Sequence, residues 1–130
     1  MARKIYNTVS LPIVFPVGTS AIDLITGYTP GYRGKIIGWQ IIASVAATGT
    51  AASQTISLEI GTTDVTGTAT AFLLAGLNAI GKVAAGTAPT GANEFGPTDT
   101  ISVELAASGT AFTAGSGHLI LTLEQSARGI

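Results

Sequence analysis

The only histidine of the chain, His118, is where a hydrolytic triad would have to be built. Such a triad needs a nucleophile on one side of the imidazole and a carboxylate on the other side to orient it. His118 follows Gly115-Ser116-Gly117 at the start of an alternating apolar run, and no acidic residue stands close to it in the sequence. We expect His118 to be a surface or packing residue, and the chain to be no enzyme. Catalysis would require a pocket that joins His118 to at least two carboxylates.

Residues 76–83 have the G-x-x-x-x-G-K spacing of a phosphate-binding loop. That loop needs a Ser or Thr after the lysine to bind Mg²⁺, and a following helix whose N-terminus meets the phosphate. Val83 stands at the Ser/Thr position, and residues 82–85 are expected to form a strand rather than a helix. We therefore expect no nucleotide cofactor here.

The seven carboxylates could supply a glycosidase pair or a calcium site. Calcium takes about six to eight oxygen ligands, commonly converging from a short loop, and no segment carries a D-x-D-type cluster. Asp99 stands beside a turn, where aspartate commonly accepts backbone N–H bonds. We expect no bound metal and no other cofactor. The seven are Asp23, Glu59, Asp64, Glu94, Asp99, Glu104 and Glu124.

Aromatic residues are candidates for contacts with other molecules. Trp39 lies in the most apolar segment of the chain and is expected in the core. Tyr28 and Tyr32 occur with Arg33 in the turn-rich segment 27–34, and protein interfaces favour Tyr and Arg. This segment is the leading candidate for a protein contact, and a purely structural turn is the alternative.

The N-terminus is the second candidate contact. Arg3, Lys4, Ile5 and Tyr6 form a basic, partly apolar segment that resembles an arm ordering on docking. A plain disordered tail is the alternative. We expect an N-terminal arm over residues 1–7 and one β-sandwich domain over residues 8–130.

Alternation of apolar and polar residues with a period of two is the dominant pattern, and it predicts antiparallel strands with one buried face. It is clearest in residues 54–60, 100–105 and 118–124. Residues 35–45 are apolar on both faces, so this strand should be central in its sheet or covered by a neighbouring subunit. We assign Ile37, Trp39 and Ile41 to one face of it, and Ile36 and Ile42 to the other.

Weaker strands are expected over residues 8–15, 21–26 and 82–85. Pro12 should place the first of these at a sheet edge, because proline has no N–H for an inner ladder. A short helical turn could form around Phe72, Leu73, Leu74, Leu77 and Ile80, as a buried plug. Together the strands predict an all-β fold, a single antiparallel β-sandwich of jelly-roll or Greek-key type.

Composition favours protein partners. Charged residues make up 10% of the chain, compared with about 25% in an ordinary soluble domain. The six Lys and Arg residues are scattered, so nucleic acid is not an expected partner. No stretch approaches the roughly 20 apolar residues that span a bilayer, so no membrane association is expected. A surface with so little charge is suited to lie against protein, although a merely polar, uncharged surface is the alternative.

A family resemblance rests on six short segments, taken in their order along the chain, and on the chain's low-charge composition, which is rich in Thr, Ala and Gly. Through them the chain resembles the small jelly-roll decoration (cement) proteins of tailed-bacteriophage capsids and their head-fibre relatives. The segments are 29–36 (TPGYRGKI), 56–67 (ISLEIGTTDVTG), 81–83 (GKV), 86–90 (GTAPT), 93–95 (NEF) and 99–104 (DTISVE).

The resemblance implies a β-sandwich, commonly trimeric, that sits on the virion exterior and bridges neighbouring subunits of the major capsid protein. It carries over no catalytic residues. The expected partners are the major capsid protein and further copies of the chain in a homotrimer, with Arg3–Tyr6 facing the capsid after synthesis in the bacterial host cytoplasm. The alternative is a tail-fibre or spike β-sandwich that binds a host receptor or carbohydrate through exposed aromatics in a groove.

Overall fold

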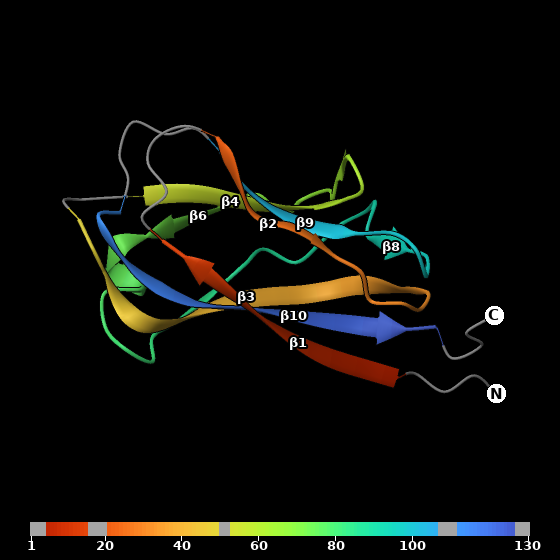
Figure 1. Ribbon diagram of the computed structural model, residues 1–130, viewed down its shortest axis with the longest axis horizontal. Coiled ribbons are helices and arrows are strands. Elements are labelled where there is room, and N and C mark those ends of the chain that lie inside the picture. The colour runs from red at the N-terminus through yellow and green to blue at the C-terminus, as the bar shows by residue number, and fades with distance from the viewer. Residues whose placement is uncertain (1–4, 16–20, 50–52, 107–111, 127–130) are drawn as a thin grey trace.

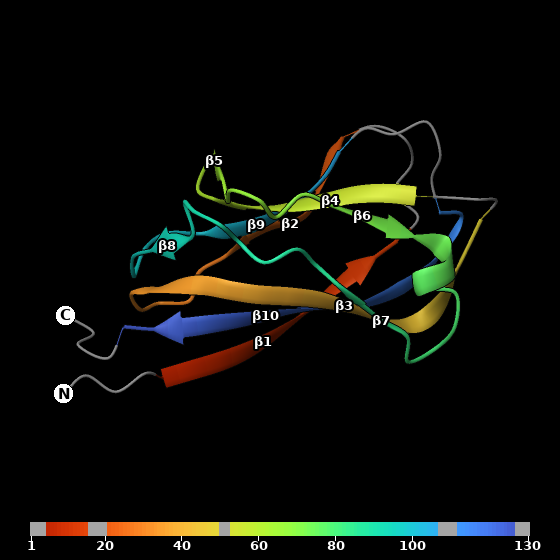
Figure 2. The same cartoon turned by 180° about the vertical axis from the view of Figure 1, so that it is seen from behind.

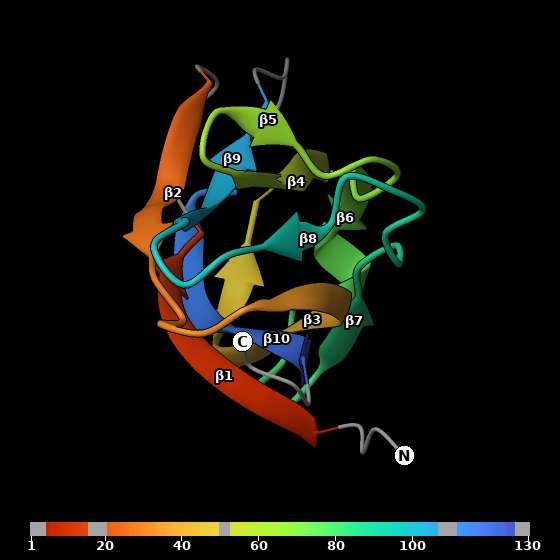
Figure 3. The ribbon, with the colours of Figure 1, turned by 90° about the vertical axis from the view of Figure 1, so that its right-hand side faces the viewer.

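The computed structural model describes residues 5–15, 21–49, 53–106 and 112–126, and it confirms an all-β sandwich (Figure 1). One sheet has the order β1-β10-β3-β7, with β8 also paired to β3, and the other has β2-β9-β4-β5, with β6 also paired to β4. Viewed end-on, the two sheets form separate layers (Figure 3). The strands are β1 (Ile5–Val14), β2 (Ile22–Tyr28), β3 (Gly34–Thr48), β4 (Ser53–Ile60), β5 (Thr63–Asp64), β6 (Thr70–Leu73), β7 (Val83–Ala85), β8 (Glu94–Phe95), β9 (Ile101–Leu105) and β10 (Ala114–Gln125).

The connectivity is that of a jelly roll. Every pairing within the two sheets is antiparallel. The first and last strands lie side by side in one sheet, and the chain crosses between the sheets after β1, β2, β3, β6, β8 and β9. The long β10 therefore fills the space between β1 and β3, which are distant from it in sequence.

Strand β3 is central, as its apolar character predicted, with β10 on one side and β7 and β8 on the other. The assignment of Ile37 to the face of Trp39 is wrong. The β10–β3 register shifts between Thr122↔Gly38 and Leu123↔Ile36. Because such a bulge adds a residue to one strand, both Ile36 and Trp39 are buried, whereas Ile37 is only half-buried.

Strand β1 is an edge strand, as Pro12 predicted, and it pairs only with β10. It begins at Ile5, earlier than expected, and its register runs from Ile5↔Gln125 to Val14↔Ser116. Residues 5–7 of the expected arm therefore belong to the sheet. The other part of that arm, residues 1–4, lies outside the described residues.

The core at one end of the sandwich is organised around Trp39. Its ring is buried, meets Phe72 edge to face at 5.3 Å, and its Nε1 donates a hydrogen bond to the Thr87 carbonyl oxygen at 2.9 Å. Gly86 donates its backbone N–H to the Trp39 carbonyl oxygen, and a Cβ at this glycine would lie 2.1 Å from the indole. The close approach of backbone and indole requires a glycine here.

The expected buried plug exists in part. A single 3₁₀ turn covers Leu74–Gly76, and Phe72 and Leu77 are buried on either side of it. Leu73 and Ile80 are instead 59% and 77% exposed. Leu73 points outward because it alternates with Phe72 on β6, and Ile80 stands in the turn in which the Lys82 N–H bonds the Ala79 carbonyl oxygen.

We predict that Gly86→Ala destabilises the fold by about 1–3 kcal/mol, because the added methyl overlaps the Trp39 ring and forces it to move. Urea unfolding followed by tryptophan fluorescence measures this. Gly38→Ala is the matched control, since a Cβ at this β3 glycine meets nothing within 4 Å. Equal stability of the two variants would contradict the packing described for Trp39.

Candidate functional site

The predicted contact residues of segment 27–34 lie partly within the fold. Tyr32 is half-buried, stacks edge to face on Phe95 at 5.9 Å, and its hydroxyl accepts a hydrogen bond from Asn7 Nδ2 at 3.0 Å. Tyr28 is half-buried at the end of β2, and burial, with a smaller contribution from Tyr32, raises its pKa. Arg33 is exposed, and its carbonyl oxygen accepts the Ser126 N–H at 2.8 Å. These contacts give the segment a structural role, and its contact with a partner stays a prediction.

Only part of the predicted N-terminal contact segment lies within the described residues. Arg3 and Lys4 lie outside the described residues. Ile5 and Tyr6 are 41% and 54% exposed at the start of β1, opposite Gln125 and Glu124.

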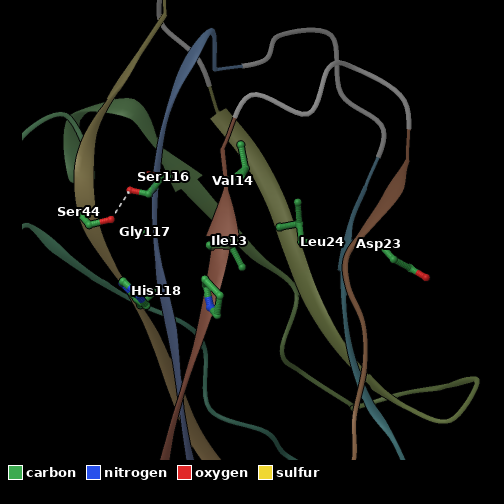
Figure 4. Close-up of a pocket in the computed structure, with 9 residues that line it drawn as sticks. Ile13, Val14, Asp23, Leu24, Ser44, Ser116, Gly117 and His118 are labelled. Carbon is green, nitrogen blue, oxygen red and sulfur yellow. Dashed lines mark hydrogen bonds between the residues drawn. The ribbon is translucent and has the colours of Figure 1, made fainter.

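His118 lies on a shallow groove of about 460 Å³ between the end of β1, β10 and β2 (Figure 4). The groove offers two serines and one carboxylate, Asp23, whose side chain points away from the imidazole in Figure 4. The Ser44 hydroxyl donates to the Ser116 carbonyl oxygen at 3.3 Å rather than to His118. The groove therefore does not bring His118 together with two carboxylates.

Two other motifs have local structural roles. Lys82 of the G-x-x-x-x-G-K segment donates to the Ala75 carbonyl oxygen and to Asn78 Oδ1, at 2.8 and 2.9 Å, and strand β7 follows it in place of a helix. Asp99 accepts the Gly96 N–H at 2.8 Å through Oδ2, as predicted for a carboxylate beside a turn.

The outer face of the β1–β10–β3–β7 sheet carries few charges, all at one end of β3, and we call it the uncharged face. The acidic and basic residues on its described strands are Lys35, Glu124 and Glu94. Lys35 stands opposite Glu124 in the β3–β10 register, with Nζ and Oε1 4.0 Å apart, and opposite Glu94 in the β3–β8 register. Val83 and Val14 are 53% and 57% exposed. Cross-strand neighbours on this face form the rows Pro12–His118–Ile42–Val83 and Ser10–Ile120–Gln40–Ala85.

The outer face of the β2–β9–β4–β5 sheet is acidic, and sequence reasoning missed this. Carboxylate oxygens of Asp23, Glu59 and Glu104 lie within 4.8 Å of one another, and Asp64 stands opposite Glu59 in the β4–β5 register. No lysine or arginine occurs on β2, β4, β5, β6 or β9. The three clustered residues come from strands distant in sequence, so no short motif announces them. Their three oxygens cover only part of the coordination that calcium requires.

Proton sharing relieves the repulsion in this cluster. The pKa of Glu59 is raised from 4.5 to about 7, first by a side-chain hydrogen bond with Glu104, then by desolvation and the neighbouring negative charges. Glu59 is only partly buried, so solvent moderates the effect on stability.

We predict that stability falls as the pH rises from about 4.5 to 7, because folded Glu59 holds its proton more tightly than the unfolded chain does. The contribution is complete below the unfolded pKa and is lost on passing the folded one. Thermal unfolding across this window should show a smaller decline in Tm for Glu59→Gln than for the wild type. Glu94→Gln, on β8 of the other sheet, is the control and should decline like the wild type. Parallel declines for all three would contradict the proton sharing.

Within the described residues, no helix has the length and hydropathy needed to cross a membrane.

No protein-family model and no curated protein matches the chain. Among solved structures, the chain is similar to a Bacillus endospore appendage chain, described as belonging to a novel family of disulfide-linked pili, at 18% identity and a TM-score of 0.42, with 97% of this chain and 90% of that chain covered. It is also similar to a chain of the infectious bursal disease virus Gx strain, at 15% identity and a TM-score of 0.34, with 95% and 36% covered. Neither likeness assigns a family or an activity. The present chain has no cysteine and cannot form disulfide links.

Proposed function

We propose that the chain is a structural, non-catalytic protein that decorates the exterior of a phage capsid, binding the major capsid protein and associating with further copies of itself. The homotrimer expected from the family resemblance is one form of that association. The observation that carries the proposal is the unequal distribution of charge between the two outer faces of the sandwich.

The uncharged face suits a permanent protein contact. Removing an unpaired charge from water is costly, whereas Ser and Thr can exchange water for hydrogen bonds across an interface. Burial of its exposed Val14 and Val83 side chains would add stabilisation of about 25 cal/mol per Å² of apolar area. Lys35 is paired with Glu124 and stands opposite Glu94, so the carboxylates of this face, unlike those of the acidic face, have a cation beside them. This face can therefore be covered at low electrostatic cost.

The acidic face suits the opposite orientation. Four of the seven carboxylates, Asp23, Glu59, Asp64 and Glu104, project from the strands of one sheet with no cation among them. Water is their least costly neighbour, because burying them without cations would require their protonation. A decoration protein with this face outward would remain hydrated while its uncharged face lies on the capsid. Many copies on one lattice strengthen such contacts by avidity.

Two observations favour this reading over its rivals. An enzyme would need partners for His118, and the groove supplies neither a nucleophile hydrogen-bonded to it nor two carboxylates. A carbohydrate-binding groove would display aromatic rings. Of the described aromatic side chains only Tyr6 is exposed, while Trp39 and all four phenylalanines are buried.

We predict that Val83→Glu weakens binding to empty capsids of the virus that encodes the chain by at least about tenfold, equivalent to 1.4 kcal/mol. The variant places an uncompensated charge on the uncharged face at a residue that is 53% exposed, so the fold should be retained. Co-sedimentation with the capsids, titrated with chain, measures the affinity.

Ala71→Glu is the matched control, because it adds the same charge at an exposed residue of β6 in the other sheet. It should bind capsids like the wild type. Failure of the wild type to co-sediment, or equal loss of binding in both variants, would reject the proposal. A glycan array probed in parallel would support the receptor-binding alternative if it were positive while capsid binding failed.

A further inference from the structure

We propose that the free edge of β1 pairs with the same edge of a second copy, joining two sandwiches through one continuous antiparallel sheet about a twofold axis at Thr8. The proposal concerns the backbone of β1 and does not depend on capsid docking. In Figures 1 and 2 this strand forms the lower margin of the molecule, and none of the described strands pairs with its outer side.

The backbone groups that face the open edge can be assigned. Phe15, just beyond β1, donates its N–H to the carbonyl oxygen of Gly115 in β10. Because alternate residues of an edge strand point their N–H and C=O in opposite directions, the odd-numbered residues of β1 bond to β10 and the even-numbered ones face outward. Pro12, which has no N–H, falls on the outward set, as its place in an intact ladder requires. Tyr6, Thr8 and Ser10 therefore present both their N–H and C=O groups at the edge.

The β1 edge lacks the protection seen at the other edges of the sandwich. Natural edge strands avoid unwanted pairing by being short, bulged or charged. The described strands β5, β6, β7 and β8 have four residues or fewer, and the β2–β9 register shifts twice within seven residues. Strand β1 has ten residues, no charged side chain and no register shift. Its single protective residue is Pro12, near its end.

Only part of the edge is open to a partner. Near its C-terminal end β1 approaches β2, and Pro12, Ile13 and Val14 line the same groove as Asp23 and Leu24 (Figure 4). An added strand would meet β2 there. The available stretch is therefore the first part of β1, from Ile5 to Leu11.

Pro12 also selects the register. If Tyr6 stood opposite Pro12 of the partner subunit, bonds would be missing at both ends of the pairing. With Thr8 opposite Thr8 of the partner subunit, Tyr6 meets Ser10, and Pro12 lies beyond the paired stretch. This register forms about six main-chain hydrogen bonds, two for each directly bonded pair. It also places Ile5, 41% exposed, opposite Leu11 of the partner subunit.

The twofold axis stands perpendicular to the joined sheet, since antiparallel neighbours in one sheet are related in that way. Both uncharged faces then lie on the same side of the dimer, and both acidic faces on the other. The dimer would present twice the uncharged area to one protein surface. Self-pairing thus enlarges the surface available for the proposed decoration function, but the pairing itself does not require that function.

Thr8→Cys tests the pairing directly, because the chain has no cysteine of its own. Directly bonded antiparallel residues have Cα atoms about 5.5 Å apart, which a disulfide bridges. We expect mild oxidation to yield a covalent dimer with the secondary structure of the wild type. Thr122→Cys is the control: it is the cross-strand neighbour of Thr8 on β10, on the same face but away from the edge. It should remain monomeric on denaturing gels.

Sedimentation of the wild type should show a dimer, and Thr8→Pro should convert it to a folded monomer by removing an outward N–H. A wild-type monomer at micromolar concentration, a trimer whose Thr8→Cys variant does not cross-link, or equal cross-linking of both cysteine variants would overturn the proposal. Val83→Glu separates the two claims, because it should lose capsid binding while the dimer persists. If the wild type bound to capsids as a monomer, the edge pairing would be wrong and the proposed function would stand.

Discussion

The antiparallel ladder between β3 and β10 is the constraint on which the other features of the structure depend. It runs from Gly34↔Gln125 to Thr48↔Ala114 and sets both faces of the larger sheet at once. Because side chains alternate across a strand, burying Leu119, Leu121 and Leu123 obliges Ile120, Thr122 and Glu124 to face outward. The uncharged face is therefore made by the same strands as the core. Its character follows from a chain that supplies few charged residues to the outward positions.

The second sheet uses the same alternation with a different outward set. Its three clustered carboxylates meet because β2, β9 and β4 are neighbours, and their proximity raises the pKa of Glu59. The core of the sandwich thus separates an acidic outer face from the uncharged face. The acidic side is most favourable in water, and the uncharged side loses little when covered. Under the proposed decoration function, that separation sets which face of the protein lies on the capsid.

Most strands could be predicted from the sequence because period-two alternation is strong where one face is buried, as in residues 118–124. Pro12 placed β1 at an edge for a reason that holds in any sheet, its missing N–H. The bulge that turns Ile37 outward was not predictable, because a register shift belongs to a pair of strands rather than to one. The acidic cluster was missed for a related reason: Asp23, Glu59 and Glu104 become neighbours only once the order of strands is known. The start of β1 at Ile5 depends on β10 extending to Gln125, which local propensity does not reveal.

In the proposed function the two outer faces have opposite roles, one covered by protein and one exposed to water. An electron cryo-microscopy map of capsids carrying the chain would distinguish the faces. We expect the β1–β10–β3–β7 sheet against the capsid surface and the carboxylates of Glu59 and Glu104 facing solvent. A map with the acidic sheet against the capsid, or with the uncharged face open to solvent in every copy, would rule this orientation out.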